Sequence, residues 1–179
     1  MRLSLDRLAC DRRGVAAVEF ALLLPILALL YFGSVELTQG VMTQERTEHV
    51  ASTVGDLVAQ SSNVTSAQLT DIFKVGDTVM YPYPTSTLKQ RVSSLQADSR
   101  GAVKVVWSKA TGGLSPLAAG SSVSGLPANV VQANESLVMA ESQDTYTSAF
   151  SRVVPNPVVF NQKAYLHPRL STQVTCGDC

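Results

Sequence analysis

Two cysteines near the end of the chain, Cys176 and Cys179, are the side chains best suited to chemistry. A Cys-x-x-Cys pair does redox work when it opens a helix that lowers a thiol pKa, and a zinc site needs further ligands. This pair ends the sequence, and neither His49 nor His167 lies near it in sequence. We therefore expect a structural disulfide, with pairing to another chain, free thiols, and metal or redox chemistry as the alternatives.

Other residues that could catalyse a reaction lack the spacing that catalysis needs. No H-E-x-x-H, P-loop, G-x-S-x-G or dinucleotide-binding motif occurs in the sequence. Glu135, Glu141 and Asp144 show no arrangement typical of a catalytic carboxylate pair. We expect His49 and His167 to be solvated or locally hydrogen-bonded. The sequence thus predicts a protein that is not an enzyme and that holds no cofactor and no metal.

Charge is balanced overall but unevenly distributed. With 14 basic and 14 acidic residues, the chain gives no reason to expect a nucleic-acid partner. The charged fraction of 16% is below the roughly 25% typical of soluble domains, which favours a membrane segment. The first 13 positions hold Arg2, Arg7, Arg12 and Arg13, and the next basic residue is Arg46. Because Lys and Arg beside a membrane segment stay in the cytoplasm, we expect a cytoplasmic N-terminus.

A long apolar run separates these two groups of basic residues. From Val15 to Phe32 the only charged side chain is Glu19. Eighteen helical residues extend about 27 Å, close to the roughly 30 Å of a bilayer's hydrocarbon core. Pro25 lies mid-run, where a membrane helix tolerates it as a kink. We predict a transmembrane helix over residues 15–35.

The helical pattern continues beyond the apolar run. One apolar helix face, with the spacing i, i+4, i+7 and i+8, is formed by Val50, Val54, Leu57 and Val58. We therefore expect a single helix from about Val15 to Gln60, whose residues 36–60 continue outside the membrane.

Residues 61–179 are predicted to form one small domain that begins with a helix. Thr65 or Ser66 can cap a short helix that runs through Phe73. We expect residues 75–86 to form a loop because they contain two prolines.

Strand-like segments fill the rest of this domain. Residues 88–97 and 102–110 flank a turn at 98–101 and are expected to form a hairpin, followed by a long surface loop over residues 111–129. Two further strands are predicted at residues 135–150 and 158–170. The fold class is therefore α+β: a small antiparallel sheet packed on the part of the long helix outside the membrane.

The segment RRGVAAVEFALLLPI, residues 12–26, resembles the prepilin signature of type IV pilin-like proteins. In that signature a basic leader ends in glycine, a peptidase cuts after it, and glutamate is the fifth mature residue. The resemblance implies a leader over residues 1–14, cleavage between Gly14 and Val15, and Glu19 and Phe20 at mature positions five and six. The string GVAAVEFALLLPIL looks most similar to the TadE/TadF-like minor pilins, or pseudopilins, of Tad pilus systems.

This resemblance implies partners and a location. The partners are a prepilin peptidase, the major pilin, other minor pilins and the inner-membrane assembly platform. The protein would be a single-pass inner-membrane protein with its C-terminal domain in the periplasm, and it would become part of an extracellular pilus on assembly. In pilins the carboxylate at the position of Glu19 pairs with the new α-amine of a neighbouring subunit; the alternative is a carboxylate that reaches the headgroups by itself.

Two alternative functions remain for such a chain. One is an uncleaved single-pass membrane protein whose outer domain binds a ligand, with residues 1–14 acting only as a topological signal. The other is a secreted protein with an ordinary signal peptide, which the length of the apolar run, Glu19 and the lack of a small-x-small cleavage site disfavour.

Overall fold

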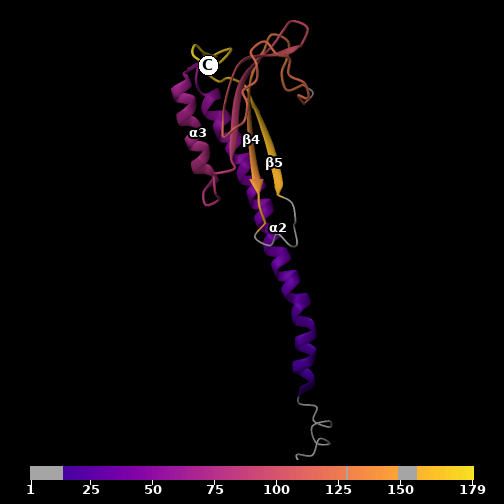
Figure 1. The fold of residues 1–179 in the computed structure, drawn as a ribbon. Helices are drawn as coiled ribbons and strands as arrows, with labels where there is room; N and C mark the ends of the chain where they lie inside the picture. The colour runs from indigo at the N-terminus through magenta and orange to yellow at the C-terminus, as the bar shows by residue number, and fades with distance from the viewer. Residues whose placement is uncertain (1–13, 128, 149–156) are drawn as a thin grey trace, which may run out of the picture. The chain divides into compact units, whose positions relative to one another are not determined.

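The computed structural model describes residues 14–127, 129–148 and 157–179 (Figure 1). The predicted leader, apart from Gly14, and the end of the strand predicted at 135–150 lie outside these residues. The described chain divides into two compact units, one that ends at Gln39 and one from Gly40 to Cys179, called here the α+β unit. The helices and strands of the described chain are α2 Val15–Ala59, β1 Asn63–Val64, α3 Ser66–Met80, β2 Lys89–Ala97, β3 Val103–Thr111, β4 Ser136–Tyr146, β5 Val158–Leu166 and β6 Thr175–Cys176.

The predicted long helix is confirmed as α2, which runs unbroken from Val15 to Ala59 and contains Pro25. The predicted antiparallel sheet is also confirmed. Its strands have the order β3-β2-β4-β5 and every neighbouring pair is antiparallel. The protein thus has the α+β fold class that the sequence indicates. A second, two-stranded parallel sheet joins β1 to β6.

The hairpin β2–β3 forms because its turn satisfies its own backbone. Asp98 Oδ1 accepts hydrogen bonds from the Arg100 and Ala102 amides, at 2.8 and 2.9 Å, and Gly101 adopts a φ of +81° that suits glycine. These two bonds, of which the bond from Ala102 has the larger effect, hold the pKa of Asp98 below its ordinary value. The turn predicted from Asp-Ser-Arg-Gly is therefore correct.

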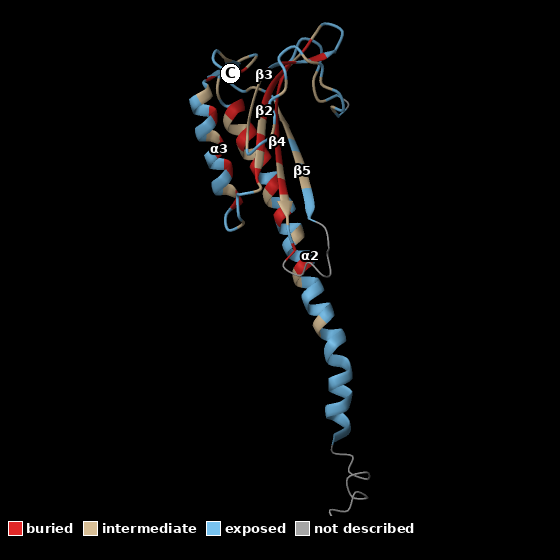
Figure 2. Cartoon of the chain, in the orientation of Figure 1, coloured by how far each residue is buried: buried red, intermediate tan, exposed pale blue. Residues whose placement is uncertain are grey.

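The main core lies between the second half of α2, α3 and one face of the sheet (Figure 2). The predicted apolar face of α2 supplies fully or nearly fully buried valines, but Leu57 is only half-buried and does not join this core. The principal core residues of α2 and the sheet are Val50, Val54, Val58, Val92, Trp107, Val138 and Ala140.

A β-bulge lets β3 contribute to both faces of the sheet. The register shifts between Ser94 and Leu95, so that Ser94 opposes Trp107 while Leu95 opposes Val105, leaving Val106 as an extra residue. Residues two apart on a regular strand share a face. Because of the bulge, Trp107 joins the core against α2 while Val105 joins a second core on the opposite face.

The surface loop predicted at 111–129 is confirmed, and it also covers this second core. Its Leu117, Val123 and Leu126 pack on the sheet face that points away from α2. The same segment also bonds to the outer edge of β3, since the Val105 amide donates to Ser121 O at 3.0 Å. The sequence did not indicate this covering role, because the sparse apolar residues of the loop have no regular period. The strand residues that they cover are Leu95, Ala97, Val103, Val105, Leu137 and Met139.

Helix α3 starts where predicted but runs further. Thr65 caps it in a capping box with Gln68, whereas the helix continues past Phe73 to Met80, so residues 75–80 are not a loop. The buried positions Leu69, Phe73, Gly76 and Met80 keep a helical spacing, with glycine at the place where the Gln90 side chain presses against the helix. The prolines lie beyond the helix end and do not interrupt it.

Gly55 allows α2 to approach the sheet closely, and its replacement is expected to destabilise the α+β unit. A Cβ there would lie 2.6 Å from Leu166 Cδ1 and 3.0 Å from Ala140 Cβ, whereas a Cβ on Gly40 of the same helix would meet nothing within 4 Å. We expect Gly55→Val to lower the free energy of unfolding of the α+β unit by about 2 kcal/mol more than Gly40→Val does. Thermal unfolding of the full chain in detergent, followed by the fluorescence of Trp107, measures both; equal melting temperatures would contradict this packing.

Candidate functional site: the apolar N-terminal helix

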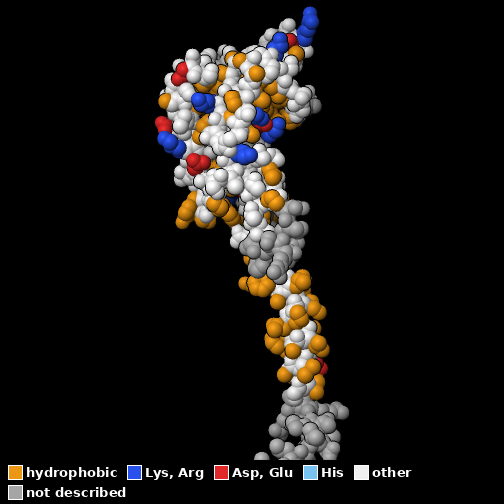
Figure 3. Space-filling view, in the orientation of Figure 1, with side chains coloured by type: hydrophobic (Ala, Val, Ile, Leu, Met, Phe, Trp, Pro, Cys, Tyr) orange, Lys and Arg blue, Asp and Glu red, His pale blue; other side chains and the backbone are white. Residues whose placement is uncertain are grey.

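The first half of α2 exposes apolar side chains at most of its positions, and Figure 3 shows them along the face in view. It is the one helix of the described residues that is long and apolar enough to cross a membrane, and no residue of its most apolar 18-residue window is buried. A helix that is apolar all round needs apolar surroundings, either lipid or other helices. Its exposed large side chains are Val15, Val18, Phe20, Leu22, Leu23, Leu24, Ile26, Leu27, Leu29, Leu30, Tyr31 and Phe32.

The four residues of the predicted processing and assembly site lie together at the start of this helix. Gly14 immediately precedes α2 and Val15 is its first residue. Glu19 and Phe20 follow one turn later, and all four residues are exposed. Val15 and Glu19 are four residues apart, so they lie on the same helix face, separated by about 6 Å along the axis. Cleavage after Gly14 and charge pairing by Glu19 remain predictions.

Polar groups towards the end of the apolar stretch are satisfied within the helix. Ser34 Oγ donates to the Tyr31 carbonyl at 2.8 Å, and Thr38 Oγ1 donates to the Ser34 carbonyl at 2.9 Å. The rings of Tyr31 and Phe32 meet edge to face, with centroids 5.4 Å apart. Hydroxyl groups bonded back to the helix need no water, which suits a helix that enters an apolar medium.

Comparison with known families shows what this part of the chain is similar to. The model of the family described as "TadE-like protein" matches residues 14–56. This part of the chain is TadE-like. The TadE-like segment begins at the predicted cleavage glycine and extends along α2 into the part that packs on the sheet. The resemblance inferred from GVAAVEFALLLPIL is therefore confirmed for this region, whereas no curated protein and no solved structure matches the chain.

Beyond the TadE-like segment, Cys176 and Cys179 are joined by a disulfide whose Cα atoms are 5.7 Å apart. The Asp178 carboxylate and the two sulfurs lie within 4.8 Å of one another. Because both sulfurs are in the disulfide, the group offers no thiolate to a metal ion. Oxidation of this pair in the cell stays a prediction.

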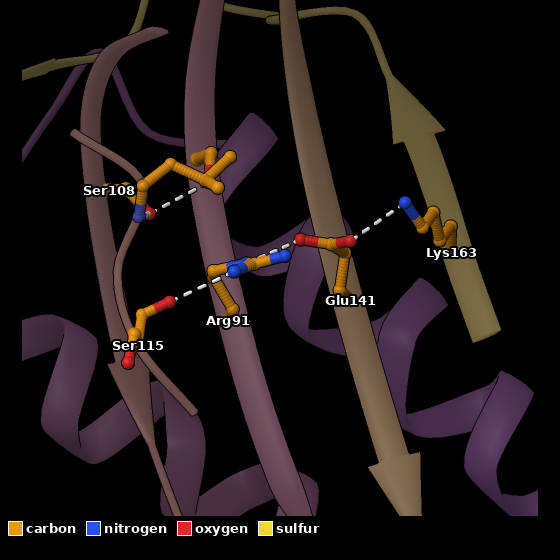
Figure 4. Close-up of polar contacts among 7 residues, drawn as sticks. Arg91, Ser108, Ser115, Glu141 and Lys163 are labelled. Atoms are coloured by element: carbon orange, nitrogen blue, oxygen red, sulfur yellow. Dashed lines mark hydrogen bonds and ion pairs between the residues drawn. The ribbon is translucent and has the colours of Figure 1, made fainter. Parts of the chain in front are cut away.

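Sequence analysis missed an ionic network that crosses three strands of the sheet (Figure 4). Glu141 on β4 pairs with Arg91 Nε on β2 at 2.5 Å and with Lys163 Nζ on β5 at 3.0 Å. Arg91 Nη1 also donates to the Ser115 carbonyl at 2.9 Å and so attaches the covering loop to the sheet. The network spans residues far apart in sequence, and only the strand register brings them together.

Glu141 is buried, and its surroundings favour the charged form. Burial acts to raise its pKa, but hydrogen bonds and charge from Arg91 and Lys163 outweigh burial, and the pKa lies below its ordinary value. Both carboxylate oxygens are occupied by cations, so Glu141 is poorly placed to take or give a proton in a reaction. The network connects β2, β4, β5 and the covering loop.

The remaining candidate residues are at the surface or serve local structure. His49 on α2 and His167 after β5 are both exposed. Asp144 is buried and accepts a hydrogen bond from Thr87 Oγ1 at 2.6 Å. The structure brings neither histidine into a group of metal ligands among the described residues.

Proposed function

We propose that this chain is a minor pilin or pseudopilin that is cleaved after Gly14 and takes part in the biogenesis or structure of a Tad-type pilus. The observation that carries this proposal is the TadE-like match over residues 14–56, which begins at the glycine of the cleavage signature. Proteins of the TadE-like pilin family are generally structural and not enzymatic, in keeping with a chain whose sequence has no catalytic motif.

The exposed apolar half of α2 would be the packing element in this role. Before assembly it would lie in the inner membrane, with the N-terminus in the cytoplasm and the α+β unit in the periplasm. After cleavage it would pack against helices of the major pilin and of other minor pilins. Small side chains permit close approach of such helices, and here they are Ala16, Ala17, Ala21 and Ala28.

Cleavage is the direct test of this proposal. Mass-spectrometric mapping of the protein from cells with an active prepilin peptidase is expected to find a chain that begins at Val15. Gly14→Val should block the cut because the side chain lies next to the bond that the peptidase must reach. Gly33→Val makes the same change further along the helix, where a Cβ also meets nothing within 4 Å, and should leave processing intact.

The same measurement separates the proposal from its rival. A mature protein that retains Met1 in those cells would contradict processing and would favour an uncleaved membrane protein with a ligand-binding outer domain.

A further inference from the structure

The C-terminal segment passes across the sheet and the start of α3 and is bonded to both. The Val174 carbonyl accepts hydrogen bonds from Trp107 Nε1 at 2.8 Å and from Ser94 Oγ at 3.2 Å, and the Val174 side chain is fully buried. One residue later, the Thr175 amide donates to the Ser62 carbonyl at 3.2 Å in the short β1–β6 sheet. Val174 is thus a firm anchor, after which the last five residues continue to α3.

Asp178 completes the N-terminal cap of α3 from the far end of the chain. The Ser66 amide, the first of the helix, donates to Asp178 Oδ1 at 2.9 Å, while Thr65 Oγ1 accepts from the Gln68 amide at 3.2 Å. The first amides of a helix have no partner inside the helix, and the helix dipole favours a negative charge beside them. Asp178 supplies both a bond and a charge that the local sequence lacks, since the first turn of α3 contains no acidic residue.

The disulfide determines where this carboxylate lies. Cys176 belongs to β6 and is bonded to Cys179, so the disulfide closes a small ring that contains Asp178. Asp178 Oδ1 lies 3.4 Å from Cys176 Sγ, inside the same turn. Without the ring, no covalent bond would restrain the residues after Cys176, and Asp178 would have to be ordered against Ser66 at an entropic cost.

We propose that the Cys176–Cys179 disulfide is a redox lock, which holds Asp178 on the N-terminus of α3 and opens when a dithiol reductant reaches it. In the opening reaction the reductant forms a mixed disulfide with one sulfur and then closes its own ring. The reductant loses two electrons and two protons, and Cys176 and Cys179 become two thiols. The first turn of α3 and the β1–β6 sheet then loosen, while the four-stranded sheet stays folded around its buried cores.

The expected effect is local because the ring is small. A disulfide across so few residues removes little entropy from the unfolded chain, so global stability changes little on reduction. Loss of a helix cap, in contrast, shifts the local opening equilibrium by about fivefold. The lock concerns the α+β unit only and does not depend on cleavage of the leader.

Hydrogen exchange on the full chain in detergent, with and without dithiothreitol, tests the proposal. Reduction is expected to speed exchange of the Ser66 and Thr175 amides about fivefold, while the amides of Val92 and Val138 in the central strands keep their rates. In the double variant Cys176→Ser/Cys179→Ser, the Ser66 and Thr175 amides should exchange at the fast rates both with and without dithiothreitol.

Asp178→Ala tests whether the disulfide acts through the carboxylate. With the disulfide intact, this variant should exchange faster at Ser66 and normally at Thr175, and reduction should add nothing further at Ser66. Unchanged Ser66 exchange on reduction of the natural chain would overturn the lock, and so would a further acceleration at Ser66 in reduced Asp178→Ala. Alkylation of protein isolated without reductant provides the last check, because two free thiols would show that no lock forms.

Discussion

Replacing Arg91 with alanine is expected to lower the free energy of unfolding of the α+β unit by about 3 kcal/mol at pH 7. The Glu141 side chain is 8% exposed and that of Arg91 18%, so water cannot readily replace the lost bond. Urea unfolding of the full chain in detergent measures the loss through Trp107, the single tryptophan, which is 5% exposed and lies in the main core.

Lys163→Ala is the matched control because it removes the other cation from the same carboxylate. The Lys163 side chain is 50% exposed, and ion pairs of exposed groups contribute at most about 1 kcal/mol. Lys163→Ala should therefore lower the free energy of unfolding by much less than Arg91→Ala does. Equal costs for the two variants would mean that burial of the pair does not govern its energy.

The pKa of Glu141 determines how the loss of unfolding free energy caused by Arg91→Ala changes with pH. In the folded protein the pKa of Glu141 lies below its ordinary value, so its contribution to stability is complete above about pH 4.3 and is lost as the pH falls through the lower, folded pKa. Removing the hydrogen bond and the charge of Arg91 moves that pKa up from its value in the natural chain. The gap in unfolding free energy between the natural chain and Arg91→Ala should therefore narrow in acid, and a gap that widens would contradict this account.

The sequence alone predicted those elements that local signals define. Helix α2 follows from a long stretch of good helix formers, the start of α3 from its Thr65 cap, and the β2–β3 hairpin from the turn at Asp98. In each case the deciding interaction joins residues at most four apart. Such interactions can be recognised in a short window of sequence.

The features that the sequence did not reveal depend on distant contacts. The last turn of α3 is helical because Met80 enters the core and Gly76 accommodates Gln90 from the sheet. The loop before β4 covers the second core only because the bulge at Val106 directs Val105 to that face. Neither the bulge nor the position of Gln90 leaves a periodic mark on the sequence.

For the candidate site, in contrast, the sequence indicated the residues, but one chain does not show their role. Gly14, Val15, Glu19 and Phe20 could be chosen because the sequence around them resembles the prepilin signature, and the structure places them together on one exposed helix end. The role proposed for this site, however, involves a peptidase and neighbouring subunits, which the structure of one chain does not contain. The structure of a single chain shows that Glu19 is exposed, whereas the pairing proposed for it involves a second chain.

Glu19→Ala is expected to leave membrane insertion and cleavage intact while it lowers incorporation into pili tenfold or more. The substitution makes the helix more apolar, so insertion is not impaired. A carboxylate in lipid costs about 2 to 3 kcal/mol unless a cation offsets it, and each 1.4 kcal/mol of lost pairing corresponds to tenfold in an assembly equilibrium. Immunoblots for precursor and mature forms, read together with pilus yield, measure both effects.

Two comparison variants distinguish the effect of the Glu19 charge from the effect of cleavage after Gly14. Glu19→Asp keeps the charge with a shorter reach and should give an intermediate pilus yield. Gly14→Val should give the same assembly defect as Glu19→Ala but with an uncut precursor, because the α-amine of Val15 is then never released. The released amine of Glu19's own chain lies one turn away on the same helix face and can compete with that of a neighbour. Normal pili in normal number from Glu19→Ala cells would show that neither amine is needed, and that Glu19 is a carboxylate which the membrane interface tolerates.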